Sequence, residues 1–413
     1  MAVLCAAFFF RAACVTASKP NEARLLLAGR GIRAFADGFI AILLPVYLVA
    51  LGYDTLHVGI LSTATLLGSA LATIGVGRWG HRFHHRRLLV GASLLMAGTG
   101  LAFAGLSAFV PLLAIAFVGT LNPSSGDVSV FLPLEHARLA NAAKGSDRTA
   151  LFAAYSLTGA LFASFGSLAA ALPDVAQRHG IPLLGSLRVM FVAYAAAGLA
   201  IWALYRRLPA ADPGVVAAPE GLGRSRRVVA RLAALFSIDA FAGGLLVQSL
   251  LALWLFKRFD LSLSAAAGFF FWTGLMTAFS QLAAPRIAAR IGLLNTMVFT
   301  HIPSSIALIG AALSPRLDVA LALLLVRSAL SQMDVPTRSA YVMALVSPSE
   351  RTAAASYTAV PRSLASSLSP TLGGALFAAG WFAAPLVACG VLKITYDLAL
   401  LMMFRKVDVE EQL

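Results

Sequence analysis

Hydrophobic positions fall into long, nearly unbroken runs, separated by short polar segments. A helix that crosses the hydrocarbon core of a bilayer needs about 20 such residues. The pattern predicts twelve spanning helices, at about residues 31–51, 57–77, 88–107, 110–137, 149–173, 187–206, 230–256, 263–284, 293–313, 317–344, 352–378 and 381–404. We therefore expect an all-α membrane protein with twelve transmembrane helices in two pseudo-symmetric six-helix bundles.

One connection is longer and more polar than the others. The stretch near 207–229 holds Pro209, Pro213 and Pro219 with several glycines and arginines, a composition typical of a flexible linker. We divide the chain at this point. The expected parts are a poorly ordered N-terminal extension, an N-terminal bundle, a cytoplasmic linker, a C-terminal bundle and a tail, at residues 1–29, 30–207, 208–229, 230–405 and 406–413.

Composition supports a membrane location and narrows the chemistry. Hydrophobic residues make up 59% of the chain and charged residues 12%, whereas soluble chains are about a quarter charged. The cysteines Cys5, Cys14 and Cys389 have neither metal-ligand nor disulfide spacing. No phosphate-binding loop or ATPase motif is present, so we expect no enzyme, no cofactor and no metal site.

The net charge of +14 is explained by topology. If the N-terminus is cytoplasmic, most of the 32 lysines and arginines fall in cytoplasmic segments, as the positive-inside rule requires. The outer segments carry only Arg178, Arg188, Lys257, Arg258 and Arg316. We expect a multi-pass protein of a bacterial-type inner membrane with both termini cytoplasmic. Nucleic acid is not an expected partner.

The two halves repeat each other. Ala34-Phe35-Ala36-Asp37-Gly38 matches Ala240-Phe241-Ala242-Gly243-Gly244, and Asp127-Val128 matches Asp334-Val335. Ser146-Asp147-Arg148 matches Ser349-Glu350-Arg351 at nearly the same offset. Matches in one order at one spacing indicate duplication, which places a binding site between the halves near the bilayer midplane.

The loop after the second helix carries a further pattern. It holds Gly77, Arg78, His81, Arg82, Arg86 and Arg87 in the frame Gly-x-x-x-Asp-Arg-x-Gly-Arg-Arg, with His81 in place of the aspartate and histidines also at 84 and 85. With two six-helix halves, this loop resembles the major facilitator superfamily over residues 30–405. The resemblance implies a conformational gate at these residues. The family's aspartate serves a cytoplasmic charge relay, which His81 does not reproduce.

Charged residues within the spans are the candidate site, because burying each costs about 2.5–3.5 kcal/mol on insertion scales. Four pairs have helical spacing and could neutralise each other locally: Arg33–Asp37, Glu135–Arg138, Asp334–Arg338 and Lys393–Asp397. We interpret Glu135–Arg138 and Lys393–Asp397 as structural. The other two lie on helices 1 and 10, which the resemblance implies line the cavity, and could be structural or functional.

Asp127, Asp239, Arg327 and Arg362 have no local partner, and Gln248 is a further polar candidate. Burial favours the neutral form of a carboxyl group, so Asp37 and Asp127 are the hypothesised proton carriers. Arg33, Arg338 and Arg362 could bind an anionic or zwitterionic substrate, or could be neutralised by the aspartates. Prolines and the polar stretch 121–127 predict interruptions in helices 1, 4, 10 and 11.

The leading prediction is a monomeric secondary transporter, symporter or antiporter, that moves a small solute by alternating access. Its partners are the solute, protons as coupling ion and the lipid bilayer. Export is one expected direction, and uptake of an organic anion or zwitterion is the alternative. A non-transporting sensor or scaffold on the same fold is the rival from another class, and it predicts fully paired midplane charges.

Overall fold

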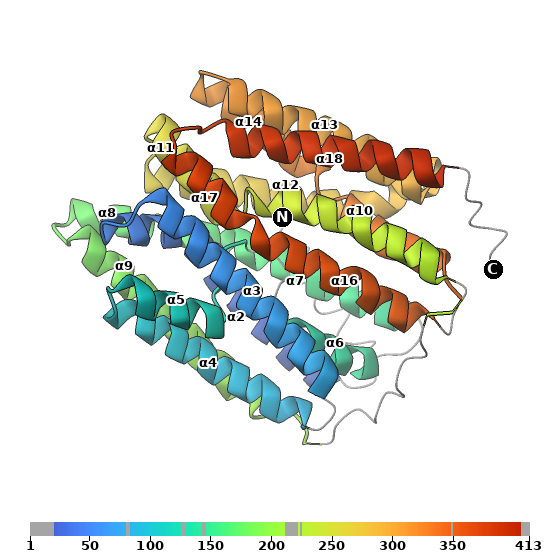
Figure 1. The fold of residues 1–413 in the computed structure, drawn as a ribbon. Helices are drawn as coiled ribbons and strands as arrows, with labels where there is room; N and C mark the ends of the chain where they lie inside the picture. The colour runs from blue at the N-terminus through green and yellow to red at the C-terminus, as the bar shows by residue number, and fades with distance from the viewer. Residues whose placement is uncertain are drawn as a thin grey trace. The chain divides into compact units, whose positions relative to one another are not determined.

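The computed structural model describes residues 20–79, 83–124, 129–142, 146–210, 222–223, 225–347 and 350–405. Within these ranges the chain is helical, and ten helices are long and apolar enough to cross a membrane (Figure 1). The two other expected spans, 110–137 and 352–378, are each divided into two shorter helices. The fold is therefore an all-α membrane fold, as the hydrophobic pattern predicts.

Two compact units divide the chain. The first comprises Met1–Tyr53, Ala64–Val215 and Leu261–Phe271, and the second comprises Asp54–Thr63, Val216–Asp260 and Trp272–Leu413. Helices α3 (Thr55–Trp79) and α12 (Leu263–Ile291) contribute residues to both. The first unit otherwise contains α2 (Pro20–Ala50), α4 (His85–Gly105), α5 (Phe109–Val118), α6 (Phe131–Ala142), α7 (Ser146–Ala169), α8 (Leu172–Arg178) and α9 (Leu183–Tyr205). The second otherwise contains α10 (Arg226–Gly244), α11 (Gln248–Phe259), α13 (Leu293–Leu313), α14 (Leu317–Leu330), α15 (Asp334–Ala344), α16 (Arg351–Leu368), α17 (Pro370–Ala378) and α18 (Ala384–Phe404).

The same helix pairs pack in each unit. In the first unit α2 packs on α7 and α4 packs on α9. In the second unit the helices at the corresponding repeat positions pair alike, α10 on α16 and α13 on α18. This shared internal packing is what a duplicated six-helix bundle predicts.

Small residues allow the closest of these crossings. Gly38 of α2 lies against the backbone of α7 at Ala163, where a Cβ atom would collide with the carbonyl oxygen. Gly244 of α10, its partner in the sequence repeat, lies equally close to Ser366 of α16. Backbones approach this closely in membranes because packing rather than water exclusion drives helix association.

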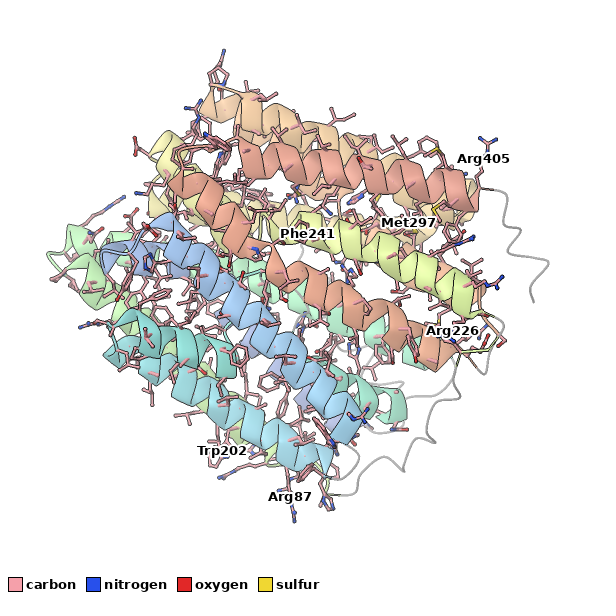
Figure 2. The ribbon with its side chains drawn as sticks, in the orientation of Figure 1. Arg87, Trp202, Arg226, Phe241, Met297 and Arg405 are labelled. Atoms are coloured by element: carbon pink, nitrogen blue, oxygen red, sulfur yellow. The ribbon has the colours of Figure 1, made fainter. Side chains whose placement is uncertain are left out.

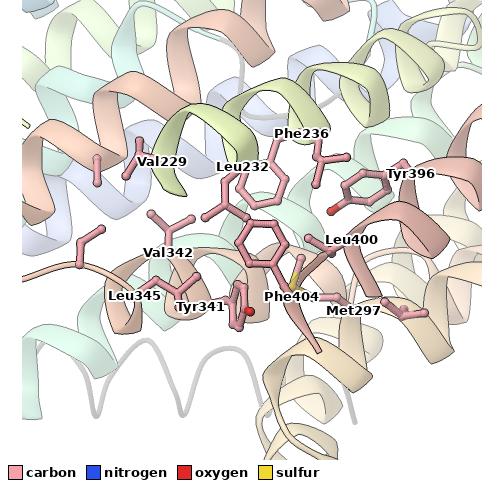
Figure 3. Packing of buried hydrophobic residues seen from close by; sticks show 14 residues of the cluster. Val229, Leu232, Phe236, Met297, Tyr341, Val342, Leu345, Tyr396, Leu400 and Phe404 are labelled. Atoms are coloured by element: carbon pink, nitrogen blue, oxygen red, sulfur yellow. The ribbon is translucent and has the colours of Figure 1, made fainter. Parts of the chain in front are cut away.

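The apolar core of the second unit lies where α10, α15 and α18 meet. Phe236 of α10, Tyr341 of α15 and Phe404 of α18 are almost fully buried there (Figure 3). The Phe236 ring also lies 6.3 Å from the ring of Tyr396. This cluster fixes the helices that carry the charged residues of the unit.

Several spans are interrupted. The break between α5 and α6 holds Asn122, whose side-chain oxygen accepts hydrogen bonds from the Ser124 amide and hydroxyl. Another break separates α16 from α17 at Ser369, just before Pro370. Short breaks also separate α10 from α11 and α14 from α15, whereas Pro45 and Pro361 lie inside continuous helices. Irregular backbone at membrane depth is tolerated where it lines protein or a cavity.

Helix α2 begins at Pro20, whereas the sequence pattern predicts a start near residue 31. Its first turns are not a surface extension, because Glu22, Ala23 and Leu26 are buried. Basic residues occupy helix ends. In the second unit Arg226 begins α10 and Arg405 follows the last residue of α18, and the two lie on the same side of the unit (Figure 2).

Candidate functional site

The first unit contains a buried ion pair that sequence spacing does not predict. Arg33 of α2 donates to both carboxylate oxygens of Glu135 on α6, at 2.5 and 2.8 Å. The hydroxyls of Tyr155 and Tyr205 also donate to this carboxylate. Arg33 lies over the Phe131 ring at 4.5 Å. Four helices, α2, α6, α7 and α9, thus meet at one fully buried carboxylate.

Arg138 is likewise paired across helices. Its Nε donates to Glu22 at the start of α2 at 2.6 Å, and its Nη2 donates to the carbonyl oxygen of Pro209 at 2.9 Å. The expected local pair Glu135–Arg138 is therefore wrong. A buried carboxylate needs several donors, and donors from neighbouring helices satisfy it better than one residue on the same helix.

Asp37 lies one turn beyond Arg33 on α2 and is buried. It interacts electrostatically with Arg33 and Arg30, and with Tyr194 of α9. The structure thus brings Asp37 close to the Arg33 network. Asp127, the other hypothesised proton carrier, lies outside the described residues.

The second unit clamps one carboxylate between cations from two helices. Asp239 of α10 accepts a hydrogen bond from Lys393 of α18 at 2.5 Å and from Arg338 of α15 at 3.1 Å. Arg338 also contacts Asp334 at 3.1 Å, so this expected local pair is present. Asp239, predicted to lack a local partner, is the centre of the cluster.

Asp397 pairs with a histidine rather than with Lys393, so the second expected structural pair is also wrong. His301 of α13 places Nδ1 3.0 and 3.1 Å from the two oxygens of Asp397. Its Nε2 lies 3.4 Å from the Lys393 ammonium. Lys393 instead donates to Asp239 of α10, a helix that packs against α18.

Among the described residues, three candidates have no such side-chain hydrogen bond or ion pair. Arg362 of α16 interacts electrostatically with Arg338, Asp239 and Asp334, and its buried Nε has no hydrogen-bond partner within the part of the chain that the structure describes. Arg327 of α14 lies near the thiol of Cys389. Gln248 begins α11, directly after the break that follows α10, and is half-buried.

Sequence reasoning missed Glu22 and His301 and misassigned the partners of Glu135, Arg138, Lys393 and Asp397. Glu22 fell in the expected extension, before the predicted first helix. His301 was not singled out among the spanning-helix residues, although an ionisable side chain at the centre of a span was a usable signal. Partners on other helices have no spacing signature in the sequence.

Comparison with known proteins decides the family. The model of the Major Facilitator Superfamily matches residues 26–332, which is more than half of the chain. The chain belongs to the Major Facilitator Superfamily. Members of this superfamily carry small-molecule solutes across membranes, so the protein belongs to a family of transporters.

Individual relatives agree with this assignment at low identity. The uncharacterized membrane protein YJR124C of Saccharomyces cerevisiae is 23% identical over 94% of this chain and 95% of its own length. A bacterial homologue of the human lysosomal transporter Spinster has a TM-score of 0.73 at 15% identity, covering 96% of this chain and 99% of its own. The nucleoside transporter NupG has a TM-score of 0.72 at 15% identity, covering 93% and 99%. At these identities the solved structures show the fold alone.

The loop expected to act as a conformational gate lies between α3 and α4. Gly77 and Arg78 occupy the exposed last turn of α3, and Arg86 and Arg87 begin α4. Arg86 donates to the carbonyl oxygen of Arg206 at 2.5 Å, just past the end of α9. A cation placed there complements the negative end of the helix dipole. His81 and Arg82 lie outside the described residues.

Proposed function

We propose that this protein is a secondary active transporter that moves a small charged solute by alternating access, coupled to protons. In this proposal the bundles 30–207 and 230–405 move against each other about the linker 208–229. Membership in the Major Facilitator Superfamily supports transport. The buried charges support a polar route, since they lie on α2, α6, α10 and α15, in the sequence positions of helices 1, 4, 7 and 10.

The observation that carries the proposal is the Asp239 clamp. The carboxylate and the Arg338 guanidinium are buried, the Lys393 side chain is 13% exposed, and the three groups lie on three helices of one unit. Removing charges from water is costly, and a well-packed apolar replacement would often be as stable. Ionisable groups within a membrane are by default a functional hypothesis, which we adopt for this cluster.

Arg362 favours an anionic or zwitterionic solute. Arg362 adjoins the clamp without a hydrogen bond to its Nε from any described residue. A guanidinium binds carboxylate or phosphate in a bidentate geometry, so such a group on the solute would satisfy it. Nucleosides are a further class to test, because NupG transports them. Both export and uptake fit this proposal.

Coupling to protons requires groups that change charge during the cycle. We propose Asp37 and Asp127 for the first unit, because both are carboxyl groups in predicted spans. Asn at either position removes the titratable proton with little change of shape. If Asp37→Asn leaves proton-driven transport unchanged, Asp37 takes no part in coupling.

We further propose a monomer in an inner membrane with cytoplasmic termini. The distribution of lysine and arginine supports this orientation. Reporter fusions in the linker 208–229 test it directly. A linker reporter active only outside the cell would contradict the orientation.

Counterflow in proteoliposomes tests transport itself. Vesicles loaded with one unlabelled compound receive the same compound in labelled form outside, and exchange requires a carrier but no driving ion. The panel contains organic anions, zwitterionic amino acids, organic cations and nucleosides. Exchange above empty vesicles for one class confirms transport. No exchange for any class would favour the sensor or scaffold alternative.

A further inference from the structure

His301 lies within the buried charge cluster of the second unit, between two aspartates and a lysine. Its Nδ1 faces Asp397 at 3.0 Å. Its Nε2 lies 3.4 Å from Lys393 Nζ and 3.8 Å from an oxygen of Asp239. The side chain is almost fully buried. The imidazole therefore meets an acceptor at one nitrogen and a donor at the other.

With Asp397 ionised and Lys393 charged, these contacts favour one protonation state of the ring. An ionised carboxylate only accepts hydrogen bonds, so Nδ1 must carry the hydrogen that points to Asp397. An ammonium only donates, so Nε2 must present its lone pair to Lys393. The observed arrangement thus fits a neutral imidazole with the hydrogen on Nδ1.

We propose that Nε2 of His301 is a proton-binding site, and that the proton couples to transport by displacing Lys393. A proton on Nε2 converts the lone pair into a donor and places two cations 3.4 Å apart. The new N–H can turn to Asp239, now 3.8 Å away, which Lys393 holds at 2.5 Å. Imidazolium and ammonium then compete for one carboxylate.

The surrounding charges fit such an exchange. Three carboxylates, Asp239, Asp334 and Asp397, face three cations, Arg338, Lys393 and Arg362 of α16, so a proton on His301 adds one positive charge to a neutral cluster and favours the release of a cation from Asp239. The other titratable or charged groups that interact with His301 or with this cluster include Cys389 and Tyr396 of α18 and Arg327 of α14.

The exchange changes which helices of the second unit are joined to α10. Asp239 belongs to α10 and is bound from α15 by Arg338 and from α18 by Lys393. Weakening the Lys393 contact loosens α10 from α18, while His301 binds α10 to α13 instead. The inference rests on the proposed function, because it gives the proton of that cycle a site in the second unit.

Ring nitrogen resonances test the site without any solute. The protein has seven histidines, so spectra of protein labelled with ¹⁵N in histidine are simple to compare with those of His301→Gln. We expect the neutral His301 ring to carry hydrogen on Nδ1 alone and to gain one on Nε2 on acidification. A neutral ring with hydrogen on Nε2, or a ring unchanged across the range in which imidazoles titrate, would overturn the proposal.

Transport measurements test the coupling. A gradient of one pH unit drives at most about tenfold accumulation per coupled proton, since one unit corresponds to a factor of ten in proton activity. The solute is the compound that exchanges in the counterflow panel. We expect His301→Gln and Asp397→Asn to retain counterflow of this solute, and their accumulation of it under a gradient of one pH unit to fall about tenfold. His179→Gln, at an exposed histidine of the first unit, is the matched control and should match the wild type.

The outcomes separate the two proposals. Absence of counterflow in the wild type rejects the proposed function. Normal counterflow with full gradient-driven accumulation in His301→Gln rejects His301 alone. If both variants lose counterflow and coupling together, the residues are structural and the coupling proposal fails.

Discussion

The Arg33–Glu135 pair makes a sharp prediction about stability. Glu135→Gln keeps the shape of the side chain and removes its charge, leaving the Arg33 guanidinium buried without its anion. The carboxylate accepts four hydrogen bonds, two from Arg33 and one each from Tyr155 and Tyr205. A neutral amide has one acceptor oxygen, and its NH₂ group would face donors.

The size of the loss follows from burial. Glu135 is fully buried and the Arg33 side chain is 3% exposed, so little water can replace the lost charge. Removing one partner of a buried pair typically destabilises by about 3–5 kcal/mol. Replacing both partners by apolar residues removes the stranded charge as well. Arg33→Met with Glu135→Leu should therefore lose much less than the sum of the two single changes.

Reversible unfolding in detergent is measured for Glu135→Gln and for the cycle of wild type, Arg33→Met, Glu135→Leu and the double variant. The first measurement gives the cost of the stranded charge, and the cycle gives the interaction free energy. The matched control is Asp318→Asn, which breaks the two-point pair of Arg316 with Asp318. That pair is exposed, and its loss should not be measurable. A loss below about 1 kcal/mol for Glu135→Gln, or additive single changes, would refute a tightly coupled buried pair.

Two further predictions concern packing and pH. Gly38→Ala places a methyl group against the α7 backbone and should lower the free energy of unfolding by about 1–3 kcal/mol. Gly91→Ala is the control, because a Cβ atom there meets no atom within 4 Å, and it should not lower stability. Equal losses for the two variants in thermal unfolding would contradict this prediction. Hydrogen bonds donated by the Ser225 hydroxyl and the Gly223 amide lower the pKa of the Glu350 carboxyl group in the folded protein. These contacts therefore stabilise the folded state fully at pH values above the ordinary carboxyl pKa, and this stabilisation is lost as the pH falls through the lowered pKa of the folded state. Amide hydrogen exchange over residues 222–231, corrected for intrinsic rates, should become faster at acid pH in the wild type. In Glu350→Gln it should not depend on pH. Equal pH dependence in both proteins would show that Glu350 does not hold this segment.

The sequence determines much of the fold because lipid imposes a length rule on apolar helices. Each of the twelve expected spans coincides with at least one helix of the structure. Gly38 and Gly244, which match in the sequence repeat, each allow a close helix crossing in their own unit. The break within helix 4 was also predicted, since Asn122 and Ser124 supply side-chain hydrogen bonds that compete with the helix. The break between α10 and α11 has no proline and was not predicted.

The site was only partly predictable, because spacing reports neighbours on one helix. Asp334–Arg338 was found that way, but the partners of Glu135, Asp239 and Asp397 all lie on other helices. Which helix faces carry charges can be read from the chain. Which of those charges meet depends on helix rotation and packing, which no local pattern encodes.

Distances between spin labels test the central claim of alternating access most directly. One pair of labels, Phe83→Cys and Ile291→Cys, lies just before the first residues of α4 and α13. The other pair, Ala108→Cys and Pro315→Cys, lies just after the last residues of these helices. The background lacks Cys5, Cys14 and Cys389. We predict two distance populations for each pair, whose ratios shift with pH in opposite directions, so that one end closes as the other opens. A single distance for each pair at every pH, in protein that remains folded, would contradict the account.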